Sequence, residues 1–203
     1  GLDVGTTRIK ALAVDLTGAP VAEAAVHTPW AHEGAQAQMS AEDLMDAVHE
    51  VLNAITTDAH WTPEIQVTGI GITSMAEAGV LLNPQGNSLA PIIAWHDPRG
   101  DVETLKDAIG AAAFEGHVGM RLNSKPSVTK ILWLEKNLGI TPHRYLSVSE
   151  YVAHQLGGEQ VSELCLVSRT GLFDVVEKRP WSATLDLVGD LLPDRVVLAG
   201  ESV

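Results

Sequence analysis

The chain opens on Gly1-Leu-Asp-Val-Gly-Thr-Thr-Arg-Ile-Lys10, and this stretch decides the fold. Residues 2–4 are short and apolar, Gly5 begins a turn of small residues, and a β-rich run follows over 9–15. A glycine-containing turn then leads to a third β-rich run over 21–27. Two turns that join three strands predict an antiparallel meander at the start of the chain.

The rest of the chain first alternates strands with a helix and then becomes mainly helical. Ser40 and Asp43 form a pattern like a capping box, and apolar residues at helical spacing extend that helix over 41–57. Further predicted segments are a strand over 65–73, a hairpin of 79–83 with 92–95, and helices over 101–113, 127–137 and 147–156. This order predicts an α/β domain with a mixed sheet flanked by helices.

The amino-acid composition limits the classes of partner that this chain is expected to bind. Among 203 residues, 26 are acidic and 13 basic, which gives a net charge of −13. Such a surface repels nucleic acid and anionic membranes, so neither is an expected partner. The single cysteine, Cys165, forms no disulfide within the chain and fits a reducing, cytoplasmic location. Because Cys165 lies among apolar neighbours, we expect a buried, inert thiol.

The turn near the N-terminus carries the first candidate chemistry. Gly5 lets the backbone approach a ligand closely, and successive amides in such a turn can form an anion-binding concavity. Thr6 and Thr7 add hydroxyl donors, and Lys10 adds a positive charge within reach of a bound phosphate. Asp3 offers an oxygen ligand that suits a water-bound Mg²⁺. An ordinary hairpin turn rich in glycine and threonine explains the same residues.

Two later loops, each after a predicted strand, carry polar and aromatic residues together. A sugar needs acceptors for its hydroxyl groups and a flat apolar wall for its C–H face. Glu77 and Asp97 supply acceptors, Trp95 supplies the wall, and Arg99 is placed to orient Asp97 through a charge-assisted pair. A solvated carboxylate at Glu77 and a core aromatic at Trp95 are the alternatives.

Taken together, these features resemble the FGGY family of carbohydrate kinases over nearly the whole chain. Five segments in the family's order carry the resemblance: Gly1–Lys10, Gly71–Glu77, the Trp-x-Asp-x-Arg segment at 95–99, the Lys-x-x-Trp helix at 130–133, and 168–174 followed by Trp181-Ser182. The order of the five segments is specific, whereas each segment alone is not.

The resemblance implies a ribonuclease-H-like (actin-type ATPase) fold and ATP-dependent phosphorylation of a hydroxyl on a sugar, polyol or sugar acid. ATP and Mg²⁺ are the implied cofactors. Phosphate contacts are implied for Gly5, Thr6, Thr7 and Lys10, and a water-mediated Mg²⁺ contact for Asp3.

Glu77, Trp95 and Asp97 are the implied substrate contacts. Ala76 stands where glycerol kinases carry Arg, xylulokinases carry Met-His where this chain has Ala76-Glu77, and Lys125 falls near the substrate Tyr of glycerol kinases. These departures point away from glycerol and xylulose toward another polyol, a ketose or a sugar acid.

We also expect that residues 1–203 are the N-terminal lobe of a longer protein, truncated at both ends and lacking the C-terminal ATP-binding lobe. In the family an Asp serves as general base, and the resemblance implies that this residue lies beyond Val203.

A non-kinase actin-like ATPase and a non-catalytic sugar-binding regulator are the alternative functions, since the Asp-x-Gly-Thr-Thr turn also occurs in heat-shock chaperones. A small-molecule sugar or polyol is the expected partner, and a homodimer is compatible with the sequence.

Overall fold

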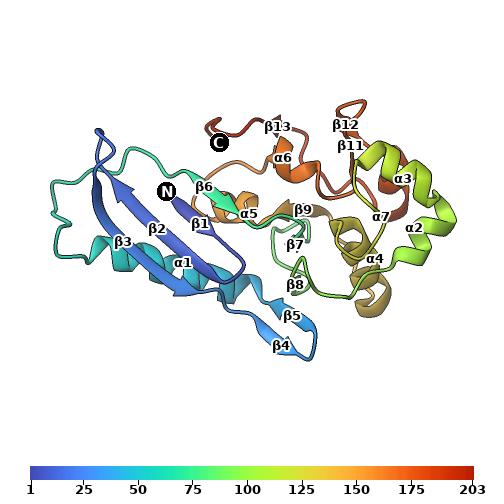
Figure 1. Cartoon of the computed structure of the whole chain (residues 1–203), viewed down its shortest axis with the longest axis horizontal. Coiled ribbons are helices and arrows are strands. Elements are labelled where there is room, and N and C mark those ends of the chain that lie inside the picture. The colour runs from blue at the N-terminus through green and yellow to red at the C-terminus, as the bar shows by residue number, and fades with distance from the viewer.

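The computed structural model describes all 203 residues (Figure 1). Its strands are β1 (Leu2–Val4), β2 (Arg8–Val14), β3 (Pro20–His27), β4 (Ala31–Glu33), β5 (Gln36–Met39), β6 (Ile72–Ser74), β7 (Gly79–Leu82), β8 (Ile92–Ile93), β9 (Arg144–Ser147), β10 (Ser162–Glu163), β11 (Phe173–Asp174), β12 (Arg179–Pro180) and β13 (Val196–Val197). Its helices are α1 (Ala41–Thr56), α2 (Val102–Ala108), α3 (Ala111–Val118), α4 (Ser127–Leu138), α5 (Val148–Gln155), α6 (Leu164–Val167) and α7 (Ser182–Val188).

The largest sheet has four strands in the order β3-β2-β1-β6. β1 and β3 both pair antiparallel with β2, which confirms the predicted meander. β6 pairs parallel with β1, so the sheet is mixed, as predicted. In this register Asp3 lies opposite Lys10 on β2 and Thr73 on β6.

Helix α1 covers one face of this sheet. The Asp43 amide donates to Ser40 Oγ at 2.9 Å, which confirms the predicted helix start. The buried face of α1, which includes Leu44 and Val48, packs with β1 and β2 in a core of 22 buried residues. The other face of the sheet carries Asp3 and Lys10 and forms an open concave surface of about 730 Å³. Ligand sites are commonly of this size, about 300–1,000 Å³.

The predicted hairpin of 79–83 with 92–95 is wrong in its pairing. β7 pairs with β9, and β8 pairs with β5. The turn between them does bring the Leu89 amide to Leu81 O, at 2.9 Å, but the strands then separate. A Cβ at Gly79 would lie 2.5 Å from the ring of Tyr145 on β9, so the missing side chain allows a close approach that the local pattern does not reveal.

Two other predicted segments differ from the expectation, one in its length and one in its continuity. Of the strand predicted over 65–73, only the part from Ile72 is paired, and Val67 and Ile70 are exposed. The helix predicted over 101–113 is two helices, because Gly110 adopts a left-handed φ of 85° between α2 and α3. The helices predicted over 127–137 and 147–156 are confirmed as α4 and α5.

A second core of 17 buried residues gathers around α3, α4 and α7, on the right of Figure 1. The β7–β9 pair is shared between the two cores. Val80 and Leu146 belong to the first core, whereas Leu81 and Tyr145 belong to the second. Alternate side chains of a strand point to opposite faces, so these two short strands join the halves of the molecule.

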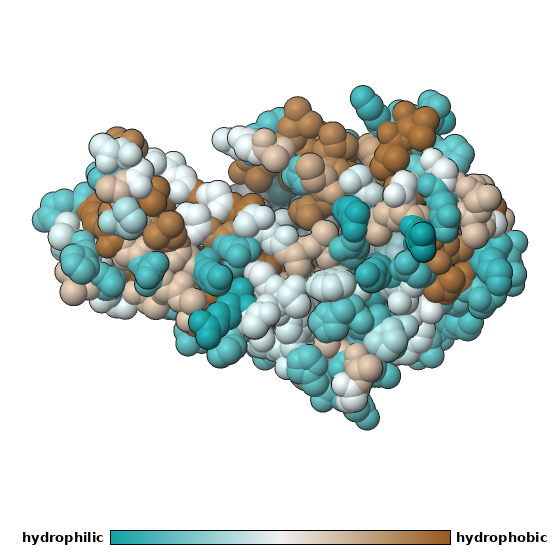
Figure 2. All heavy atoms as spheres, viewed as in Figure 1, coloured by the Kyte–Doolittle hydropathy of each residue, from teal (hydrophilic) through white to brown (hydrophobic).

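Exposed apolar side chains gather near the C-terminal end of the chain. Val196, Leu198 and Val203 are each at least 39 % exposed, and brown atoms lie along the upper edge of Figure 2 near β13. No helix of the structure has both the length and the apolar character needed to cross a bilayer.

Candidate functional site

The site begins with the turn between β1 and β2. The Gly5 amide donates to Arg8 O at 3.1 Å and closes the turn. A Cβ at Gly5 would lie 2.9 Å from Arg8 O and 3.7 Å from an oxygen of the Asp3 carboxylate. The turn is therefore too tight for any other side chain, and Asp3 lies beside it.

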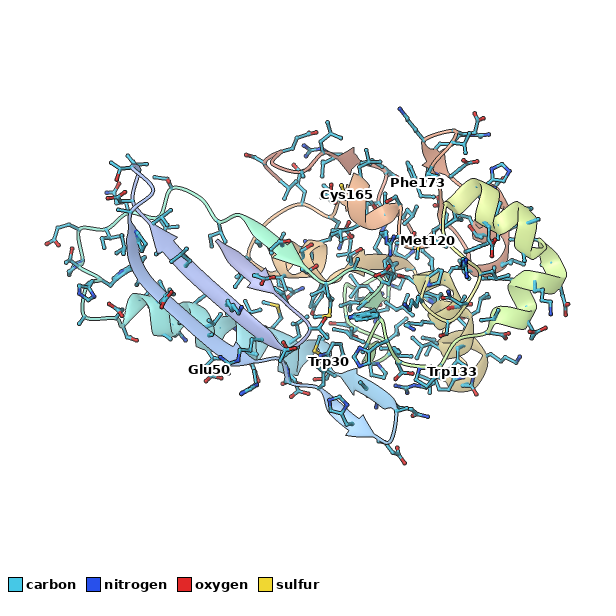
Figure 3. All side chains as sticks on the ribbon, viewed as in Figure 1. Trp30, Glu50, Met120, Trp133, Cys165 and Phe173 are labelled. Atoms are coloured by element: carbon cyan, nitrogen blue, oxygen red, sulfur yellow. The ribbon has the colours of Figure 1, made fainter.

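All three carbonyls of the turn accept hydrogen bonds from the segment that follows β3. Thr28 Oγ1 donates to Gly5 O at 2.7 Å, and the Thr28 amide donates to Thr7 O at 3.1 Å. Trp30 Nε1 donates to Thr6 O at 2.7 Å. No local sequence pattern marks Trp30 for this contact; Figure 3 shows Trp30 where the end of β3 meets the rest of the chain.

The amides of the same turn are free. Neither the Thr6 N–H nor the Thr7 N–H donates to any protein acceptor. Two successive unpaired amides, on a turn whose carbonyls are all engaged elsewhere, can form an anion-binding concavity. Asp3 and Lys10 form no ion pair and face the open side of the sheet, so both are available to a ligand or a hydrated ion.

Trp95 connects this turn to the second candidate region. It lies half-buried in a turn after β8, and its Nε1 donates to Thr6 Oγ1 at 3.1 Å. The structure thus brings together Thr6, predicted to contact phosphate, and Trp95, predicted to form the sugar wall. Lys125 Nζ lies 5.4 Å from the centre of the Trp95 ring.

Asp97 is fully buried, and both of its carboxylate oxygens have protein partners. The Ala37 amide donates to Oδ2 at 2.7 Å, and Arg99 donates from its amide, Nε and a terminal nitrogen. Burial alone would raise the pKa of Asp97, but the hydrogen bonds from Arg99 and Ala37 outweigh it and hold the pKa below its ordinary value. The predicted orientation of Asp97 by Arg99 is present, and the pair fixes the loop that carries Trp95.

Lys130 on α4 is a buried cation. The sequence identified it only as part of the Lys-x-x-Trp segment at 130–133. Its ammonium donates to Asp97 O at 3.2 Å and to Ser124 O at 2.6 Å. Burial lowers the pKa of Lys130 to about 8, since the charged form loses hydration. Lys130 therefore ties the Trp95 loop to the loop that carries Lys125.

Glu77 has an unusual backbone conformation, with a left-handed φ of 55°. Its side chain is 10 % exposed and is paired with Arg169, whose Nε donates to Glu77 Oε1 at 2.8 Å. Non-glycine residues in this region are uncommon and often occur at functional sites. Nothing local in the sequence shows the partner, because Arg169 comes 92 positions later.

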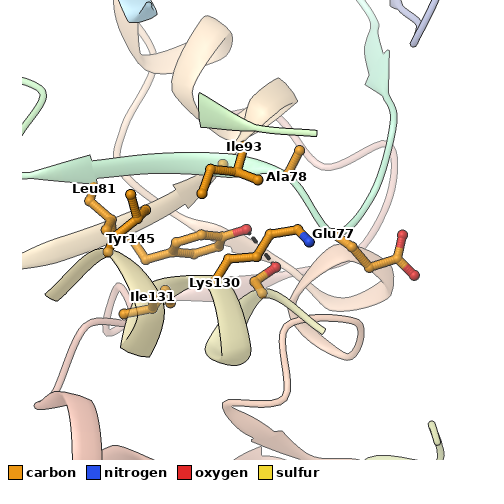
Figure 4. A pocket seen from close by; sticks show the side chains of 10 residues that line it. Glu77, Ala78, Leu81, Ile93, Lys130, Ile131 and Tyr145 are labelled. Carbon is orange, nitrogen blue, oxygen red and sulfur yellow. Dashed lines mark hydrogen bonds between the residues drawn. The ribbon is translucent and has the colours of Figure 1, made fainter. Parts of the chain in front are cut away.

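A small cavity of about 20 Å³ lies beneath Glu77 and Lys130. In Figure 4 the Lys130 side chain runs beside Tyr145 toward Glu77, and the Glu77 carboxylate points away from the cavity. Tyr145 Oη donates to Ser127 Oγ at 2.9 Å. A space of this size holds about one water molecule, so it has no room for a larger ligand.

Cys165 is exposed rather than buried, which corrects the expectation from its apolar neighbours (Figure 3). Helix α6 is four residues long and buries only Val167.

Comparison with known proteins shows the family to which this chain is similar. Residues 1–197 match the model of the FGGY family of carbohydrate kinases, N-terminal domain. L-fuculokinase of Escherichia coli (strain K12) is 28 % identical over 215 residues, covering 100 % of this chain and 44 % of the kinase. Gluconokinase of Bacillus subtilis (strain 168) is 23 % identical, covering 97 % of this chain and 39 % of that protein.

Among solved structures, gluconate kinase from Lactobacillus acidophilus superposes with a TM-score of 0.85 at 22 % sequence identity, covering 97 % of this chain and 41 % of that one. This likeness confirms the predicted ribonuclease-H-like fold of the actin-type ATPases. The chain spans less than half the length of the curated relatives named above.

Proposed function

Because this chain belongs to the FGGY family of carbohydrate kinases, we propose that the full-length protein transfers the γ-phosphoryl group of ATP to a hydroxyl of a sugar, polyol or sugar acid. The observation that carries the proposal is the hydrogen bond from Trp95 Nε1 to Thr6 Oγ1. Through this bond the turn with free amides lies directly beside the indole ring of Trp95, which we propose as the aromatic wall for the sugar. Phosphoryl transfer depends mainly on such positioning of donor and acceptor, together with stabilisation of charge.

The turn fits the phosphates of a nucleotide. The free amides of Thr6 and Thr7 and the close approach allowed by Gly5 supply the concavity, and Lys10 supplies a positive charge on the same sheet face. The Asp3 carboxylate lies beside the turn without a protein partner, which suits Mg²⁺ held through water. When bound, the metal neutralises charge on the transferring phosphoryl group.

For the sugar, we propose that Trp95 packs against the C–H face and that Glu77 accepts hydrogen bonds from hydroxyl groups. Asp97 remains a proposed substrate residue, and its full burial supports a role in holding the Trp95 loop through Arg99. From the resemblance to the family we assign the general base to a part of the protein outside residues 1–203. Asp97 is unsuited to that role, because both of its carboxylate oxygens are already engaged.

Residues 1–203 are proposed to be the N-terminal lobe of a two-lobed protein with the ATP-binding lobe beyond them. A cytoplasmic location remains a prediction from the single cysteine. A homodimer is likewise a prediction, to be checked by light scattering of the full-length protein.

The experiment that tests the proposal is a coupled assay of ADP release by the full-length protein with ATP, Mg²⁺ and a panel of polyols, ketoses and sugar acids. One substrate that stimulates ADP release well above the rate without sugar supports the kinase, and Glu77→Ala is then expected to lower kcat/KM for that substrate by about 100-fold. Nucleotide binding without stimulation by any compound would favour the non-kinase ATPase or the sugar-binding regulator.

A further inference from the structure

Lys125 lies over the face of Trp95 that is proposed to receive the substrate. The distance from Nζ to the ring centre is 5.4 Å, within the range of a cation–π contact. Lys125 is exposed and takes part in none of the eight ion pairs of the chain. An unpaired cation on the substrate wall is notable because acidic residues outnumber basic ones by two to one, 26 to 13.

The loop around Lys125 is held in place. The Lys125 amide donates to Asn123 Oδ1 at 2.8 Å, and the carbonyl of Ser124 accepts from the buried Lys130 ammonium at 2.6 Å. Pro126 then leads directly into α4, with Thr129 Oγ1 donating to its carbonyl at 2.8 Å. The stem of Lys125 therefore starts from a fixed point beside Trp95.

The neighbouring carboxylates leave this part of the site positively charged. Glu77 is paired with Arg169, and Asp97 is enclosed with Arg99. Neither Lys125 nor Lys130 forms an ion pair with a carboxylate. The four cations Arg99, Arg169, Lys125 and Lys130 therefore face two carboxylates, Asp97 and Glu77, which leaves an excess of two positive charges. A local excess of positive charge in a chain of net charge −13 attracts an anionic ligand.

Resting on the proposed kinase function, we propose that the substrate is a sugar acid whose carboxylate pairs with Lys125 while its C–H face packs on Trp95. An exposed cation–π contact is weak, so the ammonium can leave the ring when a sugar takes that face. A carboxylate on the sugar then receives a charge-assisted hydrogen bond from the displaced ammonium, which is stronger than a bond to a neutral hydroxyl. A neutral sugar gains no such pair.

The test compares sugar acids with neutral partners of the same carbon skeleton, gluconate with glucitol and xylonate with xylitol, by ADP release from the full-length protein. We expect kcat/KM for the preferred sugar acid to exceed that of its alditol by about 10-fold or more. Lys125→Met keeps most of the stem and removes the charge. It is expected to reduce kcat/KM for the sugar acid by about 10-fold, mainly through KM, and to change the alditol less than about threefold.

Lys106→Met is the matched control. Lys106 is an exposed lysine on α2 that pairs with Glu103, so this variant removes the same charge away from Trp95 and is expected to leave the preference unchanged. Calorimetric titration of the same compounds into wild type and Lys125→Met adds a readout that does not depend on turnover.

The outcomes separate the two proposals. Phosphorylation of a neutral sugar with no sugar acid accepted overturns the inference and leaves the kinase in place. Binding of a sugar acid that Lys125→Met abolishes, without any turnover, keeps the acid-binding site and overturns phosphorylation. A sugar-acid preference that Lys125→Met leaves intact overturns the role of Lys125, and absence of both binding and turnover overturns both proposals.

Discussion

Gly5 is the residue on which the shape of the proposed anion-binding turn depends. Its φ is not left-handed, so the requirement for glycine is one of space rather than of backbone conformation. Alanine at this position would place a methyl group 2.9 Å from Arg8 O, a backbone atom that moves only if β2 moves with it. The substitution therefore has to open the turn and disturb the two free amides.

We expect Gly5→Ala to raise KM for ATP by about 10-fold or more, because the amides of Thr6 and Thr7 no longer converge on one anion. The measurement is ATP-dependent ADP release by the full-length protein with its substrate held at saturation. Gly69→Ala is the control, since a Cβ at Gly69 meets no atom within 4 Å and the residue has no left-handed φ. Equal KM values for Gly5→Ala and wild type would contradict the assignment of the turn to phosphate.

The contacts of several candidate site residues were predictable because they are local. The Gly5-Thr6-Thr7 turn and the Asp97–Arg99 pair each lie within a few consecutive residues, so the sequence itself contains the whole arrangement. Arg169 was not predictable, since it reaches Glu77 from 92 positions away. The indole N–H of Trp30 was missed for a similar reason: no pattern distinguishes a packed tryptophan from one that also holds a backbone carbonyl.

Among the elements, α5 depends on a buried carboxylate at its first turn. Glu150 accepts from the Ser147 amide at 2.7 Å, completing a capping box, and from the Glu163 amide at 2.7 Å. Burial raises the pKa of Glu150 to about 7, outweighing these two hydrogen bonds. One side chain thus caps α5 and also holds the start of α6.

This arrangement predicts a pH-dependent stability. The pKa of Glu150 is about 7 in the folded chain and near 4.5 when exposed, so between these pH values the folded chain binds more protons than the unfolded chain. The free energy of unfolding contributed by this group is therefore highest below pH 4.5 and falls as pH rises toward 7. Lys130 has a pKa of about 8 and titrates above this window.

In Glu150→Gln we expect the free energy of unfolding to decrease less between pH 4.5 and 7, because the group no longer titrates. The substitution also leaves one of the two amides without an acceptor, which costs about 1–3 kcal/mol. Urea unfolding at several pH values between 4.5 and 7 measures both effects. Glu135, whose pKa burial also raises to about 7, is unchanged in the variant, so the difference from wild type isolates Glu150. Parallel pH profiles for the two proteins would show that Glu150 does not titrate in this range.

At the scale of the whole molecule, the β7–β9 pair belongs to both hydrophobic cores. Gly79 makes the pair possible, since a Cβ there would lie 2.5 Å from Leu146 O and from the Tyr145 ring. We expect Gly79→Ala to lower the free energy of unfolding by about 2–3 kcal/mol, because overpacking at this point has no room to relax.

Because the pair is shared, the loss should appear as one cooperative transition rather than as separate melting of two halves. Thermal unfolding followed by both far-ultraviolet circular dichroism and tryptophan fluorescence checks this. Gly116→Ala, in the interior of α3 with no atom within 4 Å of a Cβ, is the control and is expected to stabilise the chain by about 0.5–1 kcal/mol. Two transitions in Gly79→Ala would mean that the cores unfold independently.

The overall architecture followed from the sequence where periodicity and turns were decisive, as in the meander, α1, α4 and α5. Strand pairing between segments that are distant in the sequence could not be predicted in this way. β7 and β9 are more than 60 positions apart, and the close fit of Tyr145 against Gly79, which no local pattern reveals, favours that partner over the nearby β8. The break at Gly110 was missed because an isolated glycine within a helical pattern is often tolerated.

The three carbonyl bonds that Thr28 and Trp30 make to the turn between β1 and β2 have an entropic consequence. A loop that must become ordered around an anion loses conformational freedom at the moment of binding, and that loss subtracts from affinity. Here the backbone of residues 5–7 is fixed before any ligand arrives, so most of the ordering has already taken place during folding. For the phosphate group proposed to bind there, the turn is a preorganised receptor, so little affinity is lost to immobilising the chain.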